Sequence, residues 1–195
     1  MVFTHEAYIN RPTRAEILIP ALINNYQIVR SLIDPCVKVM AMVKANAYGH
    51  GILRTSQELI NAGVDYLGVA YLEEAVFLRN QGISAPILVL GAINTEQIAD
   101  FLRYNVEITS SSLEKSRAIS RVASSLSKTA RVHLKIDTGM ERIGVHWYNA
   151  ERFVGDSLEM ANIETVGVFT HLAKAESDGG FTGTQITRFD HMVEF

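Results

Sequence analysis

The chain has 195 residues, of which 48% are hydrophobic and 20% charged, and its formal net charge is -3. This composition is typical of a folded globular chain and excludes a largely disordered one. The mildly acidic balance predicts no basic surface for nucleic acid, and no apolar run reaches the roughly 20 residues that a transmembrane helix needs. We therefore expect neither nucleic acid nor a membrane as a partner.

The cysteine content and the first residues bear on where the protein works. Cys36 is the only cysteine, so no disulfide can form within the chain, and a reducing compartment is expected. Residues 1–16 lack the basic stretch and the apolar run of a secretory signal. These features predict a cytoplasmic protein.

Strand-like and helical segments alternate along the chain. Residues 13–19 are predicted to form a short strand, and Pro20 suits the first turn of the helix that follows. Apolar runs rich in β-branched residues then predict six strands, at residues 37–44, 66–70, 86–91, 106–109, 131–137 and 165–171. Helical periodicity predicts helices near residues 51–62, 71–81, 95–104, 111–126, 149–161 and 184–195. Two of them begin with the spacing of a capping box, Asn94 with Gln97 and Ser111 with Glu114.

Strands separated by single helices predict an α/β fold of parallel β-α-β units with right-handed crossovers. A doubly wound sheet and a (β/α)8 TIM-type barrel both fit this pattern. A dinucleotide-binding sheet would carry G-x-G-x-x-G after its first strand, whereas K-A-N-A-Y-G-H-G stands at residues 44–51, which favours the barrel. Since such a barrel has eight strands and typically about 250 residues, we expect an incomplete barrel of about six βα units.

Lys44 ends the first of the six strands. Active sites of barrels form at this end of the strands, and a lysine amine can attach pyridoxal phosphate. By position alone, a lysine that ends a strand more often extends into solvent. In the strand at 131–137, His133, Lys135 and Asp137 share one face, which is either the interior of the barrel or the solvated face of an edge strand.

The stretch V-K-A-N-A-Y-G-H-G at residues 43–51 resembles the cofactor-lysine motif of alanine racemases, pyridoxal-phosphate enzymes of fold-type III. The resemblance implies that Lys44 carries pyridoxal 5'-phosphate and exchanges the α-proton of the D-enantiomer. It also implies that Tyr48 contacts the cofactor phosphate.

Two more segments carry the same resemblance. H-L-K-I-D-T-G-M-E-R-I-G at residues 133–144 implies that Lys135 is a carbamylated lysine and that Arg142, which it orients, approaches the cofactor's phenolic oxygen and the substrate carboxylate. F-T-H-L-A at residues 169–173 implies that His171, at the end of the sixth strand, lies against the cofactor ring. The Q-x-x-R-F spacing in the last helix is also similar to these racemases, but it carries no chemistry that we can name.

The resemblance covers residues 11–195, about the first half of such an enzyme. It implies that the complete protein is a homodimer that interconverts L-alanine and D-alanine, which supplies D-alanine for peptidoglycan. The second base would be a tyrosine from the C-terminal β domain of the partner subunit. Residues 1–20 are expected to belong with that absent β domain and residues 21–195 to form the partial barrel, so the chain alone should have little or no activity.

Two other functions remain open. One is a serine or broad-specificity racemase of the same fold, although such enzymes often lack the lysine that stands here at position 135. The other is a non-catalytic barrel that binds pyridoxal phosphate, which would need a complete barrel and would not be expected to carry the Lys135 to Arg142 segment. The six histidines show no metal-ligand spacing, so no metal site is expected.

Overall fold

The computed structural model describes residues 13–176 and 180–194, and the chain divides into two compact units, Met1–Val37 and Lys38–Phe195. In the first unit, α1 (Ile19–Ser31) begins with Pro20 in its first turn, as predicted. The guanidinium of Arg30 donates hydrogen bonds to the carbonyl oxygens of Pro35 and Val37 and so closes the turn after the helix. The predicted strand at residues 13–19 is wrong. Residues 13–18 have no regular structure, because a strand is stable only beside another strand and the described part of this unit offers none. The expected domain boundary at residue 20 stays a prediction.

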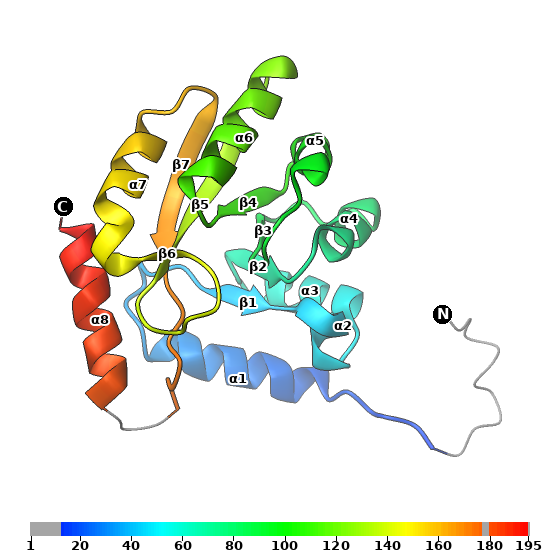
Figure 1. Cartoon of the computed structure of the whole chain (residues 1–195). Coiled ribbons are helices and arrows are strands. Elements are labelled where there is room, and N and C mark those ends of the chain that lie inside the picture. Colours follow the sequence, from blue (N-terminus) through cyan, green and yellow to red (C-terminus); the bar gives the residue numbers. More distant parts are fainter. Residues whose placement is uncertain (1–12, 177–179, 195) are drawn as a thin grey trace. The chain divides into compact units, whose positions relative to one another are not determined.

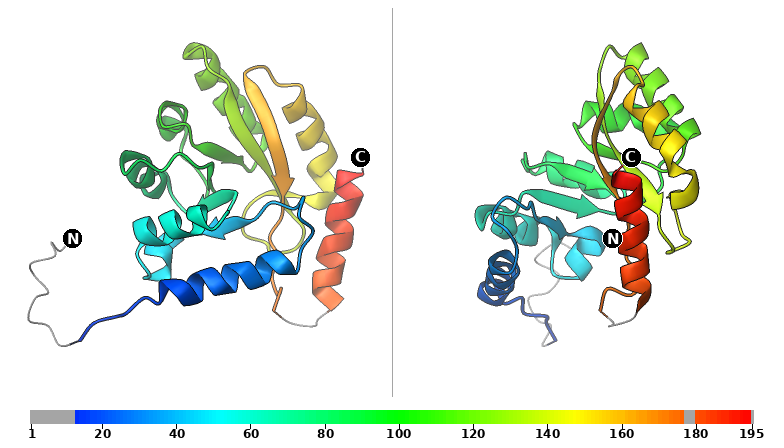
Figure 2. Two further views of the ribbon diagram at one scale, coloured as in Figure 1. Left: turned by 180° about the vertical axis from the view of Figure 1, so that it is seen from behind. Right: turned by 90° about the vertical axis from the view of Figure 1, so that its left-hand side faces the viewer.

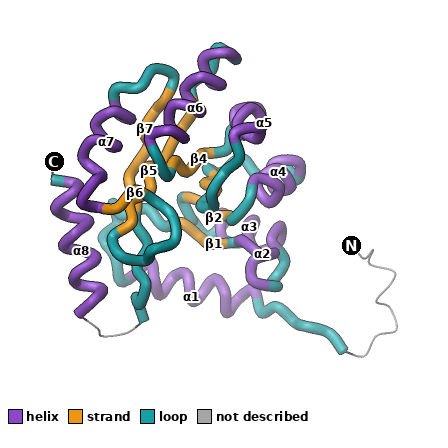
Figure 3. The backbone as a smooth tube through the Cα atoms, in the orientation of Figure 1, coloured by secondary structure: helices purple, strands orange, loops and turns teal. Residues whose placement is uncertain are grey.

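The second unit consists of alternating strands and helices (Figures 1 and 3). Its strands are β1 (Met40–Met42), β2 (Tyr66–Val69), β3 (Ile87–Val89), β4 (Glu107–Ser110), β5 (Ala130–Asp137), β6 (Val145–His146) and β7 (Ile163–Phe169). Its helices are α2 (Lys44–Tyr48), α3 (Ile52–Asn61), α4 (Leu72–Asn80), η2 (Thr95–Gln97), α5 (Ile98–Arg103), α6 (Leu113–Ser125), η3 (Trp147–Asn149), α7 (Ala150–Leu158) and α8 (Gly180–Val193). All six strands predicted after residue 20 are present, and the two-residue strand β6 was not foreseen.

The order of the strands decides between the two folds that the sequence left open. β1, β2, β3, β4 and β5 are neighbours in that order, β7 pairs with the edge of β5 opposite β4, and every pair is parallel. A doubly wound sheet would reverse its strand order at a switch point, whereas this sheet adds each new main strand on the same side. The second unit is therefore a partial (β/α)8 barrel, as expected.

The helices cover one face of this sheet. Val132, Leu134 and Ile136 of β5 are fully buried, and α6 contacts β4, β5 and β7 while α7 contacts β7. The right-hand view of Figure 2 shows α6 and α7 on the same side of β7. The opposite face of β5, which carries His133, Lys135 and Asp137, is therefore the interior side of the barrel.

The starts of two helices test the predicted capping boxes. The backbone N–H of Asn94 donates to the side chain of Gln97 at 3.3 Å, which agrees with the first box. The second prediction was wrong by one residue. Ser112, not Ser111, caps α6, and its hydroxyl accepts from the backbone N–H of Lys115 at 3.1 Å. Both serines have a hydroxyl that can cap a helix, and the residue at which β4 ends decides which of them becomes the cap.

An ion cluster fills the interior face near the amino ends of β4 and β5. Glu107 accepts hydrogen bonds from Nε of Arg131 at 2.9 Å and from Nε2 of His133 at 2.6 Å. The His133 ring stands edge-on to Tyr66 and Phe169. Burial alone would raise the pKa of Glu107, but the hydrogen bonds and charges of His133 and Arg131 hold that pKa below 4.5. His133 thus belongs to a structural cluster, although it shares its strand face with Lys135.

Among the described residues, no helix combines the length and the apolar character that crossing a bilayer requires.

Candidate active site

The element α2 (Lys44–Tyr48), which follows β1, is a single left-handed turn and not an ordinary right-handed helix. Residues 45–48 have φ angles between 52° and 56°, a conformation that costs about 1–2 kcal/mol for each residue with a side chain. Asn46 tolerates it better than most residues, and Gly49 continues the path with a φ of 92°. Only Asn46 and Gly49 of K-A-N-A-Y-G suit this conformation, so the turn was not anticipated from the sequence.

Two side chains hold this left-handed turn in place. The side-chain oxygen of Asn46 accepts from the backbone N–H of Ile52 at 2.9 Å. One carboxylate oxygen of Glu74, on α4, accepts from the N–H of Ala45 at 2.6 Å, and the other accepts from the N–H of Ala70 at 2.8 Å. Since Ala45 follows β1 and Ala70 follows β2, Glu74 joins the ends of two neighbouring strands and fixes the backbone beside Lys44.

The Asp137 carboxylate organises the loop that follows β5. It accepts backbone hydrogen bonds from Gly139 at 2.8 Å and from Glu141 and Arg142 at 3.2 Å each. Burial alone would raise the pKa of Asp137, but these backbone N–H groups, together with that of Met140, hold it below its usual range. The acid therefore stays ionised and shapes the loop from which Arg142 extends.

Lys135 is a buried amine on the interior face of β5. Its residue is 4% exposed, its Nζ lies 5.0 Å from the centroid of the Phe169 ring, and it donates to the carbonyl of Ile136 at 3.3 Å. Burial lowers the pKa of Lys135, the charge of Asp137 opposes this and the charge of Arg142 adds to it, and together they bring the pKa to about 8. A larger fraction of Lys135 is therefore neutral at pH 7 than for an ordinary lysine, and only a neutral amine can react with carbon dioxide.

Lys135→Met is expected to raise the free energy of unfolding of the unmodified chain by about 2 kcal/mol at pH 7. The pKa shift from 10.5 to about 8 corresponds to about 3 kcal/mol of unfavourable burial, and a thioether of similar length can keep the contact with an aromatic ring. The lowered pKa sets the sign: the unfavourable term is complete below pH 8 and fades as the pH rises towards 10.5.

Chemical denaturation in buffer freed of carbon dioxide, between pH 7 and 10, measures this difference. Lys38→Met is the matched control, because Lys38 is exposed and its replacement should change stability by less than about 0.5 kcal/mol. Equal stabilities of wild type and Lys135→Met at pH 7 would contradict the expected cost of burying this amine.

The five residues named from the sequence stand beyond or near the carboxyl ends of β1, β5 and β7, which lie at the same end of a parallel sheet. Lys44 and Tyr48 follow β1, and the Lys44 Nζ lies 6.0 Å from the centroid of the Tyr48 ring. Lys135 lies near the end of β5 and Arg142 in the loop after it. His171 follows β7 by two residues, because the strand ends at Phe169 and not at the predicted residue 171.

Electrostatics connects these groups. Partial burial lowers the pKa of His171, and the positive charges of Arg142, Lys135 and Lys44 lower it further. Three cations from two different loops and one strand therefore act on one imidazole. Such a surplus of positive charge at the mouth of a barrel suits an anionic ligand.

Two supporting residues were missed by the sequence analysis. Glu74 stands three residues after Tyr71 at the start of α4, and a tyrosine is not the serine, threonine or aspartate that usually signals a capping box. Gln185 is fully buried on α8 and bonds to both His171 and Thr138. The Q-x-x-R-F spacing pointed to this glutamine without revealing its partners.

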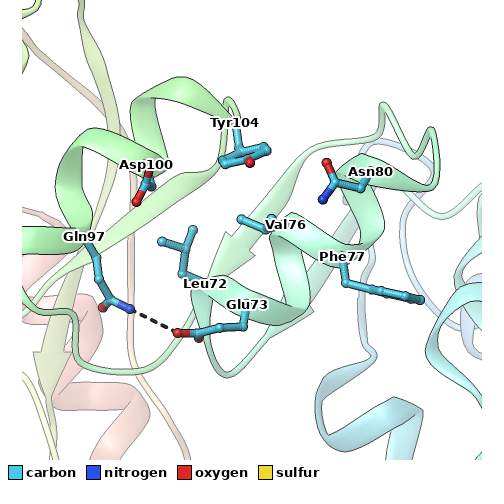
Figure 4. Close-up of a pocket in the computed structure, with 8 residues that line it drawn as sticks. All are labelled: Leu72, Glu73, Val76, Phe77, Asn80, Gln97, Asp100 and Tyr104. Carbon is cyan, nitrogen blue, oxygen red and sulfur yellow. Dashed lines mark hydrogen bonds between the residues drawn. The ribbon is translucent and has the colours of Figure 1, made fainter. Parts of the chain in front are cut away.

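Two other features of the second unit remain apart from these residues. Asp137, Glu141 and His146 offer ligand atoms within 4.8 Å of one another, but the Asp137 oxygens are already occupied by backbone N–H groups, so the cluster carries no metal assignment. A groove of about 480 Å³ lies between α4 and α5, where Gln97 donates to Glu73 (Figure 4). None of the five residues predicted for the site lines this groove.

Comparison with known proteins adds independent observations. The family model described as "Alanine racemase, N-terminal domain" matches residues 17–195. Alanine racemase 2 of Caldanaerobacter subterraneus subsp. tengcongensis is 39% identical over 186 residues, 94% of this chain and 48% of that protein. The solved alanine racemase of Clostridium difficile 630 has a TM-score of 0.91 and 34% identity, over 95% of this chain and 49% of that one. The histidine racemase of Leuconostoc mesenteroides subsp. sake has a TM-score of 0.84 and 25% identity, over 91% of this chain and 48% of that one.

The chain thus spans about half the length of the relatives it matches. The family model covers nearly all of the described residues, and the TM-score of 0.91 shows that the solved racemase has the same fold over 95% of this chain. The chain belongs to the alanine racemase family, and it corresponds to the N-terminal domain of these enzymes.

Proposed function

We propose that the full-length protein interconverts L-alanine and D-alanine with pyridoxal 5'-phosphate as cofactor. The observation that carries this proposal is the gathering of Lys44, Lys135, Arg142 and His171 at one end of the barrel, where burial and the charges of the three cations lower the pKa of the imidazole. The alanine racemases among the relatives support the choice of substrate.

The donor set fits this cofactor by its chemistry. Pyridoxal phosphate has an aldehyde, a phosphate and a phenolic oxygen, and the described residues offer an amine, a phenol and a guanidinium for them in Lys44, Tyr48 and Arg142. Tyr48 is 61% exposed and therefore accessible to a ligand. When bound, the cofactor would supply an electron sink that acidifies the α-carbon of the amino acid.

In this proposal each side chain has a separate task. Lys44 attaches the cofactor and moves the proton at its Nζ on one face of the substrate. The planar guanidinium of Arg142 binds the substrate carboxylate. Lys135, as a carbamate, would be an anion that holds Arg142 in place, so that the repulsion between two cations is replaced by an ion pair. Tyr48 binds the phosphate, and His171 lies against the ring.

Racemisation needs proton transfer on both faces, and Lys44 serves one of them. We place the second base on a partner subunit, so the active form would be a homodimer. The only cysteine in the sequence, Cys36, also leads us to propose a reducing compartment such as the cytoplasm. The chain of 195 residues, tested by itself, is then expected to show little or no racemisation.

Exchange of the α-proton in deuterated water, followed by NMR, tests the proposal on the full-length protein. L- and D-alanine should exchange and interconvert at an enzymatic rate that depends on added pyridoxal phosphate. Turnover of serine or histidine in preference to alanine would show that the protein is a racemase for a different amino acid. The likeness to a histidine racemase favours this second candidate function. Cofactor binding without exchange of the α-proton of any amino acid would refute the proposal that the protein is a racemase. Normal activity of the 195-residue chain alone would refute the shared site.

A further inference from the structure

Gln185 is a fully buried amide that makes three hydrogen bonds, through both its oxygen and its nitrogen, to two loops. Its Oε1 accepts from the backbone N–H of Ala173 at 2.8 Å. Its Nε2 donates to the carbonyl of His171 and to the hydroxyl of Thr138, at 3.0 Å each. The residue is 0% exposed, and burying such a group is costly unless all its partners are present.

These partners belong to segments that are far apart in the sequence. Thr138 directly follows β5, whereas His171 and Ala173 follow β7. The hydroxyl of Thr138 also lies 2.8 Å from that of Thr170, so the two strand ends meet at this point. Gln185 therefore joins the loop that carries Arg142 to the loop that carries His171.

The next turn of α8 strengthens the same connection. Arg188 donates from Nη1 to the carbonyl of Thr138 at 2.8 Å, and its guanidinium lies 5.5 Å from the centroid of the Trp147 ring. Two side chains, three residues apart on one helix, thus both donate to Thr138 at the end of β5, one to its hydroxyl and the other to its carbonyl oxygen. Residues 170–176 have no regular secondary structure, so tertiary hydrogen bonds are needed to fix their path.

We propose that Gln185 is a positioning residue, which holds the backbone of the His171 loop against the end of β5 so that His171 stays among Lys44, Lys135 and Arg142. This inference rests on the proposed function for its effect on turnover, but its structural part concerns the protein without cofactor. Removing the amide should let the His171 loop move away from the three cations while the barrel itself remains folded.

The test compares Gln185→Met and Gln185→Glu with Gln97→Met in the full-length protein. Methionine keeps the length of the side chain and removes all three hydrogen bonds. Glutamate keeps an acceptor for Ala173 but sets an anionic oxygen against the carbonyl of His171. Gln97 is a half-buried glutamine directly before α5, outside the site, and serves as the control.

The first measurement needs no cofactor. NMR titration of the His171 ring should show its pKa rising towards the ordinary value in both Gln185 variants and staying at the wild-type value in Gln97→Met. The second measurement adds pyridoxal phosphate. The visible circular dichroism of the bound cofactor should change and kcat for alanine should fall roughly 100-fold, while borohydride still fixes the cofactor on Lys44.

Each alternative outcome decides the matter. A wild-type His171 titration in both variants would overturn the inference, and so would the failure of both variants to fold while Gln97→Met folds, because Gln185 would then serve the fold alone. If only the methionine variant fails to fold, the glutamate variant decides. A shifted titration in a protein that never racemises alanine would sink the proposed function and leave the positioning role standing.

Discussion

Lys44→Ala in the full-length protein is expected to abolish covalent attachment of pyridoxal phosphate and to lower racemisation of alanine by at least about 1,000-fold. The substitution removes the amine that attaches the cofactor together with the proton carrier on one face of the substrate. The left-handed turn should remain, because its hydrogen bonds to Glu74 and Asn46 involve neither the amine nor the side chain at position 44. Borohydride reduction followed by mass spectrometry of the peptide around residue 44 measures attachment directly.

Lys38→Ala is the matched control for this experiment. Lys38 precedes β1 whereas Lys44 follows it, so the two lysines flank opposite ends of the same short strand. The control should keep full attachment and full turnover. Cofactor fixed on another lysine in Lys44→Ala, with turnover retained, would show that the site has been assigned to the wrong residue.

Glu107→Ala is expected to lower the free energy of unfolding by roughly 3 kcal/mol, the low end of the loss seen when one partner of a buried ion pair is removed. Glu107 has a side chain that is 5% exposed, and it binds both Arg131 and His133. The loss is limited because Arg131 has a side chain that is 40% exposed and can turn to water. Urea denaturation at pH 7 measures the change.

Glu164→Ala separates this effect from a general loss of negative charge. Glu164 also faces Arg131, at 3.6 Å, but its side chain is 56% exposed, so its loss should cost less than about 1 kcal/mol.

The pH dependence of the stability gives a second check. Because the folded pKa of Glu107 lies below 4.5, its contribution is present above pH 4.5 and is lost as the pH falls through the folded pKa. The gap between wild type and Glu107→Ala should therefore close in acid, and a gap that widens there would contradict the ion cluster.

The sequence predicted most of the barrel because its central strands, such as β3 and β4, are buried on both faces. Apolar runs such as residues 86–91 leave little doubt about a strand, and single intervening helices require parallel pairing. Residues 13–19 show the limit of this reasoning. Their strand-like pattern is local, whereas a strand depends on a neighbour that the pattern does not supply.

The candidate site divides in the same way. Lys44, Lys135, Arg142 and His171 could be predicted because their segments resemble a known family. Glu74 and Gln185 could not, since each acts through hydrogen bonds to backbone groups that are distant in sequence, and a backbone N–H looks the same at every position. The left-handed turn escaped prediction for a related reason, because four successive residues with positive φ contradict the ordinary preference of each of them.

The open sheet has a consequence for how this polypeptide behaves in solution. In the described residues, β1 pairs only with β2, and β7 pairs only with β5. The outer edge of β7, whose sequence is I-E-T-V-G-V-F, therefore presents a row of backbone donors and acceptors along an apolar strand, which is a template for another strand. Further strands that closed the barrel would cover this edge. A polypeptide of residues 38–195 produced alone is expected to self-associate through it. Closure of the barrel in this family would thus protect the polypeptide from aggregation as well as shape its pocket.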